Sequence, residues 1–199
     1  MVPATADVAR PPRYSPALEN TSDEAPAREA RFLRHTLATL AYRAEKVLRD
    51  PPAGFASYRI GPASRTPLEL VAHLGDLLEW ATPLAAGRRT WNAGGTGAWD
   101  SDVERFFAAL ARLDVRLASA APLGYSAEQI FQGPIADALT HVGQLAMLRG
   151  MLGSAVRPES YVRAEIRIGC VGRSQVAARA EFDGDASHPP RGGGDAASE

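Results

Sequence analysis

The sequence predicts an all-α protein: a four-helix bundle with disordered tails at both ends and a short extended C-terminal arm. Two observations carry this prediction. Four segments place apolar residues three or four positions apart, the spacing of one helix face, and no group of segments alternates as the strands of a sheet do. Helices of this kind bury their apolar faces against one another in an antiparallel-type bundle, although the long connections leave the topology open.

The first helix is expected from about Ala25 to Arg49. Its apolar residues lie on one face: Leu33, Leu37, Leu40, Ala44 and Val47. Pro51 and Pro52 then end the helix, because a residue that precedes proline avoids the helical conformation.

The second helix is expected to begin after Thr66, which is followed by Pro67 at the first helical position and by Glu69 at the third. A threonine and a glutamate at this spacing form a capping box, and proline is favoured at the first position of a helix. One face of this helix then carries Leu70, His73, Leu74, Leu77 and Trp80, and the helix ends near Gly87.

The third helix is expected to open with a second capping box, from Ser101 to Glu104. Its apolar face consists of Val103, Phe106, Phe107, Leu110, Leu113 and Leu117. The connection before it holds a glycine-rich stretch between Trp91 and Trp99, which is either a cover for a pocket or a surface loop fixed by two aromatic side chains.

The fourth helix is expected to follow Gly133 and Pro134 and to run to about Leu152, with Gly153 ending it. Beyond it, residues 162–168 alternate apolar and charged side chains, which is typical of an extended strand. A lone strand has no partner, so we expect an arm that lies over the bundle or across a dimer interface.

Composition divides the chain into a disordered N-terminal segment (residues 1–23), the helical domain with its arm (24–182) and a disordered tail (183–199). Both ends are rich in proline, glycine and polar residues, which bury too little apolar surface to offset the entropy lost on ordering. The composition of the whole chain is that of an ordinary globular protein, with 45% hydrophobic and 23% charged residues.

Charge and residue usage exclude several functions. With 22 basic and 23 acidic side chains, the chain lacks the basic excess of nucleic-acid-binding domains. No stretch of about 18 residues is free of charge and proline, so no membrane span is expected, and no apolar secretory signal begins the chain. We therefore expect a cytoplasmic protein. The single cysteine, Cys170, excludes an internal disulfide, and the single lysine, Lys46, follows Glu45 and so excludes a phosphate-binding loop of the Gly-Lys-Ser/Thr type.

The four histidines differ in their surroundings. His188 lies in the C-terminal tail, and His35 lies off the apolar face of the first helix. His73 and His141 fall within apolar faces, where an imidazole needs a hydrogen-bond partner or a metal ion.

Asp137 precedes His141 by four residues, so the two side chains lie next to each other on the helix. With His73 from a facing helix they make two histidines and one carboxylate, a ligand set that leaves positions open for water or substrate, as catalytic metal centres do. The alternative is one core histidine with a satisfied hydrogen bond and one ordinary Asp–His pair.

Two stretches, 66–80 (TPLELVAHLGDLLEW) and 137–153 (DALTHVGQLAMLRGMLG), resemble the second and last helices of the DinB/YfiT-like four-helix-bundle family. The resemblance covers roughly residues 28–153. In that family one histidine of the second helix and two of the last bind a divalent metal, which carried over gives His73, Asp137 and His141. Asp137 stands where the family has histidine, and this carboxylate either favours harder ions or marks a lost metal site.

The resemblance implies a divalent transition metal (zinc, nickel, iron or manganese) that activates a low-molecular-weight thiol for transfer or isomerisation, or a hydrolytic water. It also implies a small-molecule substrate and a homodimer. Gln144 and Arg149 follow His141 on nearly the same face and either orient a substrate or make capping contacts within the bundle. The alternative function is a non-catalytic, dimeric stress or interaction protein that has lost the metal.

Overall fold

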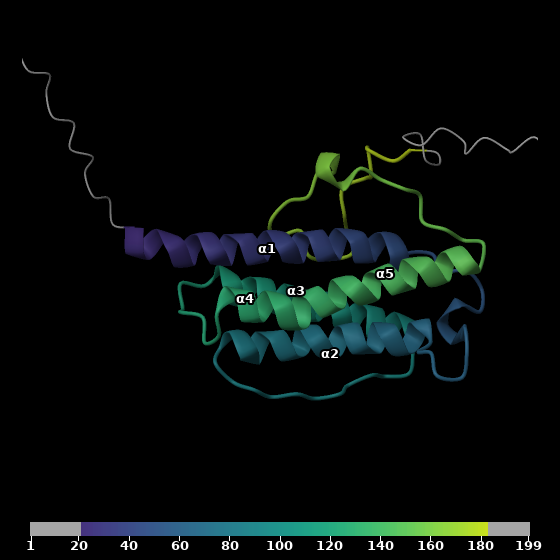
Figure 1. The fold of residues 1–199 in the computed structure, drawn as a ribbon, viewed down its shortest axis with the longest axis horizontal. Coiled ribbons are helices and arrows are strands. Elements are labelled where there is room, and N and C mark those ends of the chain that lie inside the picture. Colours follow the sequence, from purple (N-terminus) through teal and green to yellow (C-terminus); the bar gives the residue numbers. More distant parts are fainter. Residues whose placement is uncertain (1–20, 183–199) are drawn as a thin grey trace, which may run out of the picture.

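The computed structural model describes residues 21–182, and they form the expected four-helix bundle (Figure 1). The first three helices are α1 (Thr21–Leu48), α2 (Pro67–Ala85) and α3 (Trp99–Ala118). The last helix is one continuous helical run with three parts, namely α4 (Ala127–Ile130), the π-helical segment η2 (Phe131–Ile135) and α5 (Ala136–Met151). Within the described range no helix is long and apolar enough to cross a membrane.

Two short 3-10 turns complete the secondary structure: η1 (Phe55–Ser57) and η3 (Tyr161–Arg163). The predicted segments 1–20 and 183–199, which include His188, lie outside the described residues. The helix α1 begins at Thr21, four residues before the expected start.

The apolar faces predicted for the first and third helices are buried throughout, from Leu33 to Val47 and from Val103 to Leu117. On α2 the leucines are buried as expected, whereas His73 and Trp80 are only partly covered. Side chains from all the helices fill one continuous core between them. The bundle therefore rests on the burial of this apolar surface.

The direction of the helices is not simply alternating. The guanidinium of Arg105, early in α3, bonds to the carbonyl oxygen of Ala72, early in α2, and Arg116 reaches that of Ala85 at the end of α2 at 2.7 Å. The helices α2 and α3 therefore run parallel, and the connection between them (residues 86–98) returns along the length of α2 (Figure 1). The final run α4–η2–α5 is antiparallel to α2.

The capping box of α2 is confirmed. Backbone N–H of Thr66 donates to Oε2 of Glu69 at 2.7 Å, and backbone N–H of Glu69 donates to Oγ1 of Thr66 at 3.2 Å. Gly153 adopts a positive φ of 72° just after the last helix, as its expected role at the helix end requires.

The capping box predicted at Ser101 is wrong. The helix α3 already begins at Trp99, so Ser101 lies inside its first turn. Asp102, whose side chain is fully buried, instead accepts the backbone N–H of Thr96 at 2.9 Å.

The start predicted for the last helix is also wrong. The helical run begins at Ala127, behind a capping box formed by Ser126 and Gln129, and passes through Gly133 and Pro134. Proline in an α-helix clashes with the carbonyl four residues earlier. Here Pro134 lies in a π-helical turn, whose wider ring accommodates it.

The C-terminal arm is not a strand among the described residues. Its only ladder contact is an isolated antiparallel bridge between Glu159 and Glu181, and Val162 is 98% exposed. The arm does lie over the bundle, as expected, beside α1 (Figure 1). The rings of Tyr161 in the arm and Tyr42 in α1 pack edge to face, with centroids 6.4 Å apart.

An ion-pair cluster fastens the arm to α1. Nζ of Lys46 lies 2.7 Å from Oε2 of Glu159 and 2.7 Å from Oε1 of Glu181, and the hydroxyl of Tyr42 donates to Glu159 at 2.7 Å. Lys46 is 7% and Glu159 0% exposed in their side chains. The hydrogen bond from Lys46 lowers the pKa of the Glu181 carboxyl. The contact therefore stabilises the fold at pH values above the ordinary pKa of a glutamate, and this stabilisation is lost as the pH falls through the lowered pKa.

We expect Lys46→Ala to lower the free energy of unfolding by about 3 kcal/mol, because it leaves the buried carboxylate of Glu159 without its cation. Chemical denaturation measures the change. Arg49→Ala is the control: Arg49 is 60% exposed and its pair with Glu45 contributes at most about 0.5 kcal/mol. Equal losses in the two variants would contradict the role given to the buried cluster.

Candidate metal centre

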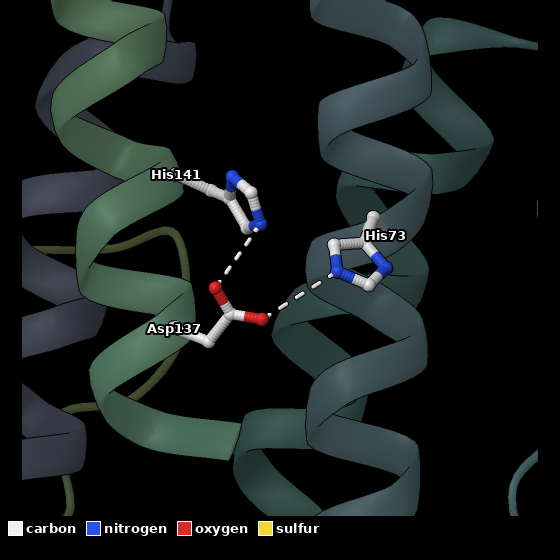
Figure 2. A group of neighbouring side chains, drawn as sticks. All are labelled: His73, Asp137 and His141. Atoms are coloured by element: carbon white, nitrogen blue, oxygen red, sulfur yellow. Dashed lines mark ion pairs between the residues drawn. The ribbon is translucent and has the colours of Figure 1, made fainter. Parts of the chain in front are cut away.

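Three side chains with metal-binding atoms converge between α2 and α5. Oδ1 of Asp137 lies 3.3 Å from Nε2 of His141, and Oδ2 of Asp137 lies 3.6 Å from Nε2 of His73. Figure 2 shows the carboxylate between the two rings, with one oxygen toward each. One ligand atom from each residue lies within 4.8 Å of the other two.

These separations resemble the edges of a coordination polyhedron more closely than hydrogen bonds. An N–H···O hydrogen bond is typically about 2.9 Å long. Two ligands bound at about 2.0–2.1 Å to a tetrahedral ion lie about 3.3 Å apart. The pair of His141 and Asp137 already has this spacing, and the distance from Asp137 to His73 is slightly wider at 3.6 Å.

Gln144 fixes the orientation of His141. Nδ1 of His141 lies 2.8 Å from Oε1 of Gln144. An amide oxygen only accepts hydrogen bonds, so the ring proton is on Nδ1 and the lone pair of the neutral ring is on Nε2. That lone pair is on the nitrogen that faces Asp137, as a metal ligand requires.

His73 is held in a form that can bind a cation. Its pKa lies below the ordinary value of 6.5, because of partial burial first, and then because of the charges of Arg65 and His141. Its side chain is 20% exposed, whereas that of Asp137 is 46% exposed. A neutral imidazole and an accessible carboxylate together favour the capture of a cation from solvent.

The connection between α2 and α3 covers one side of His73. The ring of Trp91 lies 5.9 Å from that of His73 and 5.7 Å from that of Trp80, measured between centroids. The loop is fastened to α2 by the backbone N–H of Gly94, which donates to Oδ1 of Asp76 at 2.8 Å. Two roles were expected for this loop, and the structure favours a surface loop fixed by aromatic side chains. Trp91 contacts Trp80 and His73, and no residue of the loop lines the cleft at the three candidate ligands.

The close approach of this loop to α2 requires glycine. A Cβ atom on Gly95 would lie 2.9 Å from the Cβ of Ala72, closer than real side chains pack. The loop is further held by Arg105 of α3, which bonds to Asp76 at 2.8 Å and to Glu79 at 3.1 Å. The close backbone contact at Gly95 and the ion pair of Arg105 with Asp76 therefore help to position Trp91, in addition to the contacts of its own ring.

The other histidine and polar residues singled out in the sequence have separate places. His35 is exposed on α1, as expected. Arg149 is not brought to the site, because its guanidinium bonds to the carbonyl oxygens of Val47 (2.8 Å) and Asp50 (3.1 Å) at the end of α1. Arg149 therefore makes capping contacts within the bundle, which was the alternative to orienting a substrate.

Arg65 was missed in the sequence. It immediately precedes the capping residue Thr66, and nothing in the local pattern marks it. The structure places its positive charge near enough to lower the pKa of His73. Only the folded position of the segment before α2 makes this proximity visible.

In comparisons with known proteins, no family model, curated protein or solved structure matches this chain.

We expect the His73 imidazole of the metal-free protein to titrate with a midpoint below 6.5, because burial and neighbouring positive charge disfavour its protonation. The ring proton signals in an NMR titration measure the midpoint, and His73→Gln assigns them. A midpoint above 6.5 would mean that the carboxylate of Asp137 dominates, contrary to this description.

Proposed function

We propose that His73, Asp137 and His141 bind one divalent transition metal ion and that the protein is a metal-dependent enzyme. The observation that carries this proposal is the convergence of the three side chains from two helices at separations close to those of metal ligands. Two histidines and one carboxylate leave coordination positions for water or substrate, the arrangement of catalytic metal sites.

A bound ion would lower the pKa of a water or thiol on an open position and present it as a nucleophile for hydrolysis or thiol transfer. The residues of the chain have distinct roles around it. Gln144 keeps the His141 proton on the nitrogen away from the ion. Asp137 contributes a negative charge that favours harder ions than three histidines would, within the set of zinc, nickel, iron and manganese.

The resemblance of residues 66–80 and 137–153 to the DinB/YfiT-like family supports the same assignment, since the family's metal-binding positions fall on the three proposed ligands, with Asp137 in place of a histidine. The alternative, a bundle whose histidines only fill the core, is less well supported. The side chains of His73 and His141 are 20% and 12% exposed and lie in the wall of a cleft.

The test is the metal content of the tag-free protein after incubation with zinc, nickel, iron(II) or manganese and removal of free ion, measured by elemental analysis. We expect about one equivalent in the wild type and its loss in His141→Ala, with the helical circular dichroism unchanged. His35→Ala is the matched control, because it removes an exposed histidine from α1. No metal in the wild type, or full metal content in His141→Ala, would contradict the proposal.

We expect Gln144→Ala to weaken metal binding by about 10- to 100-fold, because the His141 ring loses the acceptor that fixes its proton. Gln144→Glu keeps an acceptor at the same place and restores the affinity. Competition with a chromophoric chelator measures both. Unchanged affinity in Gln144→Ala would show that the hydrogen bond to His141 does not support the site.

A further inference from the structure

The proposed metal ligands lie in the wall of a cleft of about 540 Å³, a volume that suits a small molecule. The cleft is bounded by the segment before α2, by α2 itself and by α5. A ligand in it would have access to the open coordination positions of the ion. The other walls of the cleft therefore bear on the chemical class of the substrate.

Apolar side chains form most of these walls. Leu70 and Leu148 are each 3% exposed and make the floor. Ile60 and Met147 are 50% and 55% exposed and flank the cleft from the segment before α2 and from α5, respectively. Large apolar side chains left exposed around a concave site favour a ligand with an apolar part.

One cation, Arg65, also lines the cleft. Its guanidinium takes part in no hydrogen bond or ion pair within residues 21–182, and it is exposed. Neighbouring Arg59, by contrast, is bonded to Glu69 at 3.1 Å, so that carboxylate is already neutralised. Arg65 is thus a charged group with five donors and no acceptor supplied by the described part of the chain.

The charges around the cleft sum to a positive value once an ion is present. A divalent cation and the carboxylate of Asp137 leave one positive charge, and Arg65 adds a second. Asp76, the other acid near His73, is paired with Arg105 at 2.8 Å and does not line the cleft. An anion is the ligand that such a cleft attracts.

We propose that the substrate of the metal centre is a small organic anion with an apolar chain, whose carboxylate or similar group is bound by Arg65 while the apolar chain lies against Ile60 and Met147. This inference rests on the proposed function. Arg65 acts here as a specificity-determining residue, because the guanidinium fork matches the two oxygens of a carboxylate.

The test is binding of hexanoate, with hexanol and hexylamine as neutral and cationic probes of the same length. The chain has three methionines, so the labelled methyl group of Met147 is a resolved NMR reporter inside the cleft, assigned with Met147→Leu. We expect hexanoate to bind more tightly than hexanol and hexylamine. Arg65→Gln should weaken hexanoate binding about tenfold and leave hexanol unchanged, and Arg65→Lys should lie between.

Arg163→Gln is the control, because Arg163 is also an exposed arginine but lies in η3 on the arm. The titrations are made on metal-free and zinc-loaded protein. If zinc does not bind, the proposed function fails, while the metal-free titration still tests the role of Arg65. Equal affinity for hexanoate in Arg65→Gln and wild type, or equal binding of hexylamine and hexanoate, would overturn the inference.

Discussion

The π-helical turn in the last helix determines which side chains of α5 face α2, and it thereby places Asp137 opposite His73. Successive residues of an α-helix turn by about 100°, and a π turn holds one residue more than an α turn. The segment Phe131–Ile135 therefore rotates every later side chain relative to α4. Because α5 packs against α2 in this register, Asp137 and His141 lie opposite His73 and the leucines of α5 still face the core.

Ion pairs hold the surroundings of the candidate site in place. Arg105 pairs with Asp76 and Glu79, and Asp76 also accepts the backbone N–H of Gly94 in the loop that places Trp91 on His73. Arg149 serves the helix ends instead. Among the described residues that line the cleft, Asp137 contributes the carboxylate and Arg65 the guanidinium.

Patterns along the sequence predicted the features that depend on residues close together in the chain. The capping box of Thr66 and Glu69 and the apolar faces of the helices follow from spacing alone, as does the pairing of Asp137 with His141. His73 joined them as a candidate ligand through the expected facing helix and the family resemblance, and the structure brings the three together. Tertiary contacts decided the rest. Ser101 and Glu104 have the spacing of a capping box, but α3 already begins at Trp99, and the neighbouring Asp102 accepts the backbone N–H of Thr96. Pro134 is tolerated because it lies in a π-helical turn. Arg65 lies near the three candidate ligands because of the way the segment before α2 folds, and no local sequence pattern predicts this proximity.

X-ray absorption at the edge of the bound metal tests the central claim most directly, because it reports the ligands themselves. The account predicts two imidazole nitrogens at about 2.0–2.1 Å together with oxygen ligands, from Asp137 and from solvent. The His73→Ala variant should lose one imidazole contribution or the ion altogether. A sulfur ligand at about 2.3 Å, which only Cys170 or a methionine can supply, or a spectrum without imidazole, would contradict it.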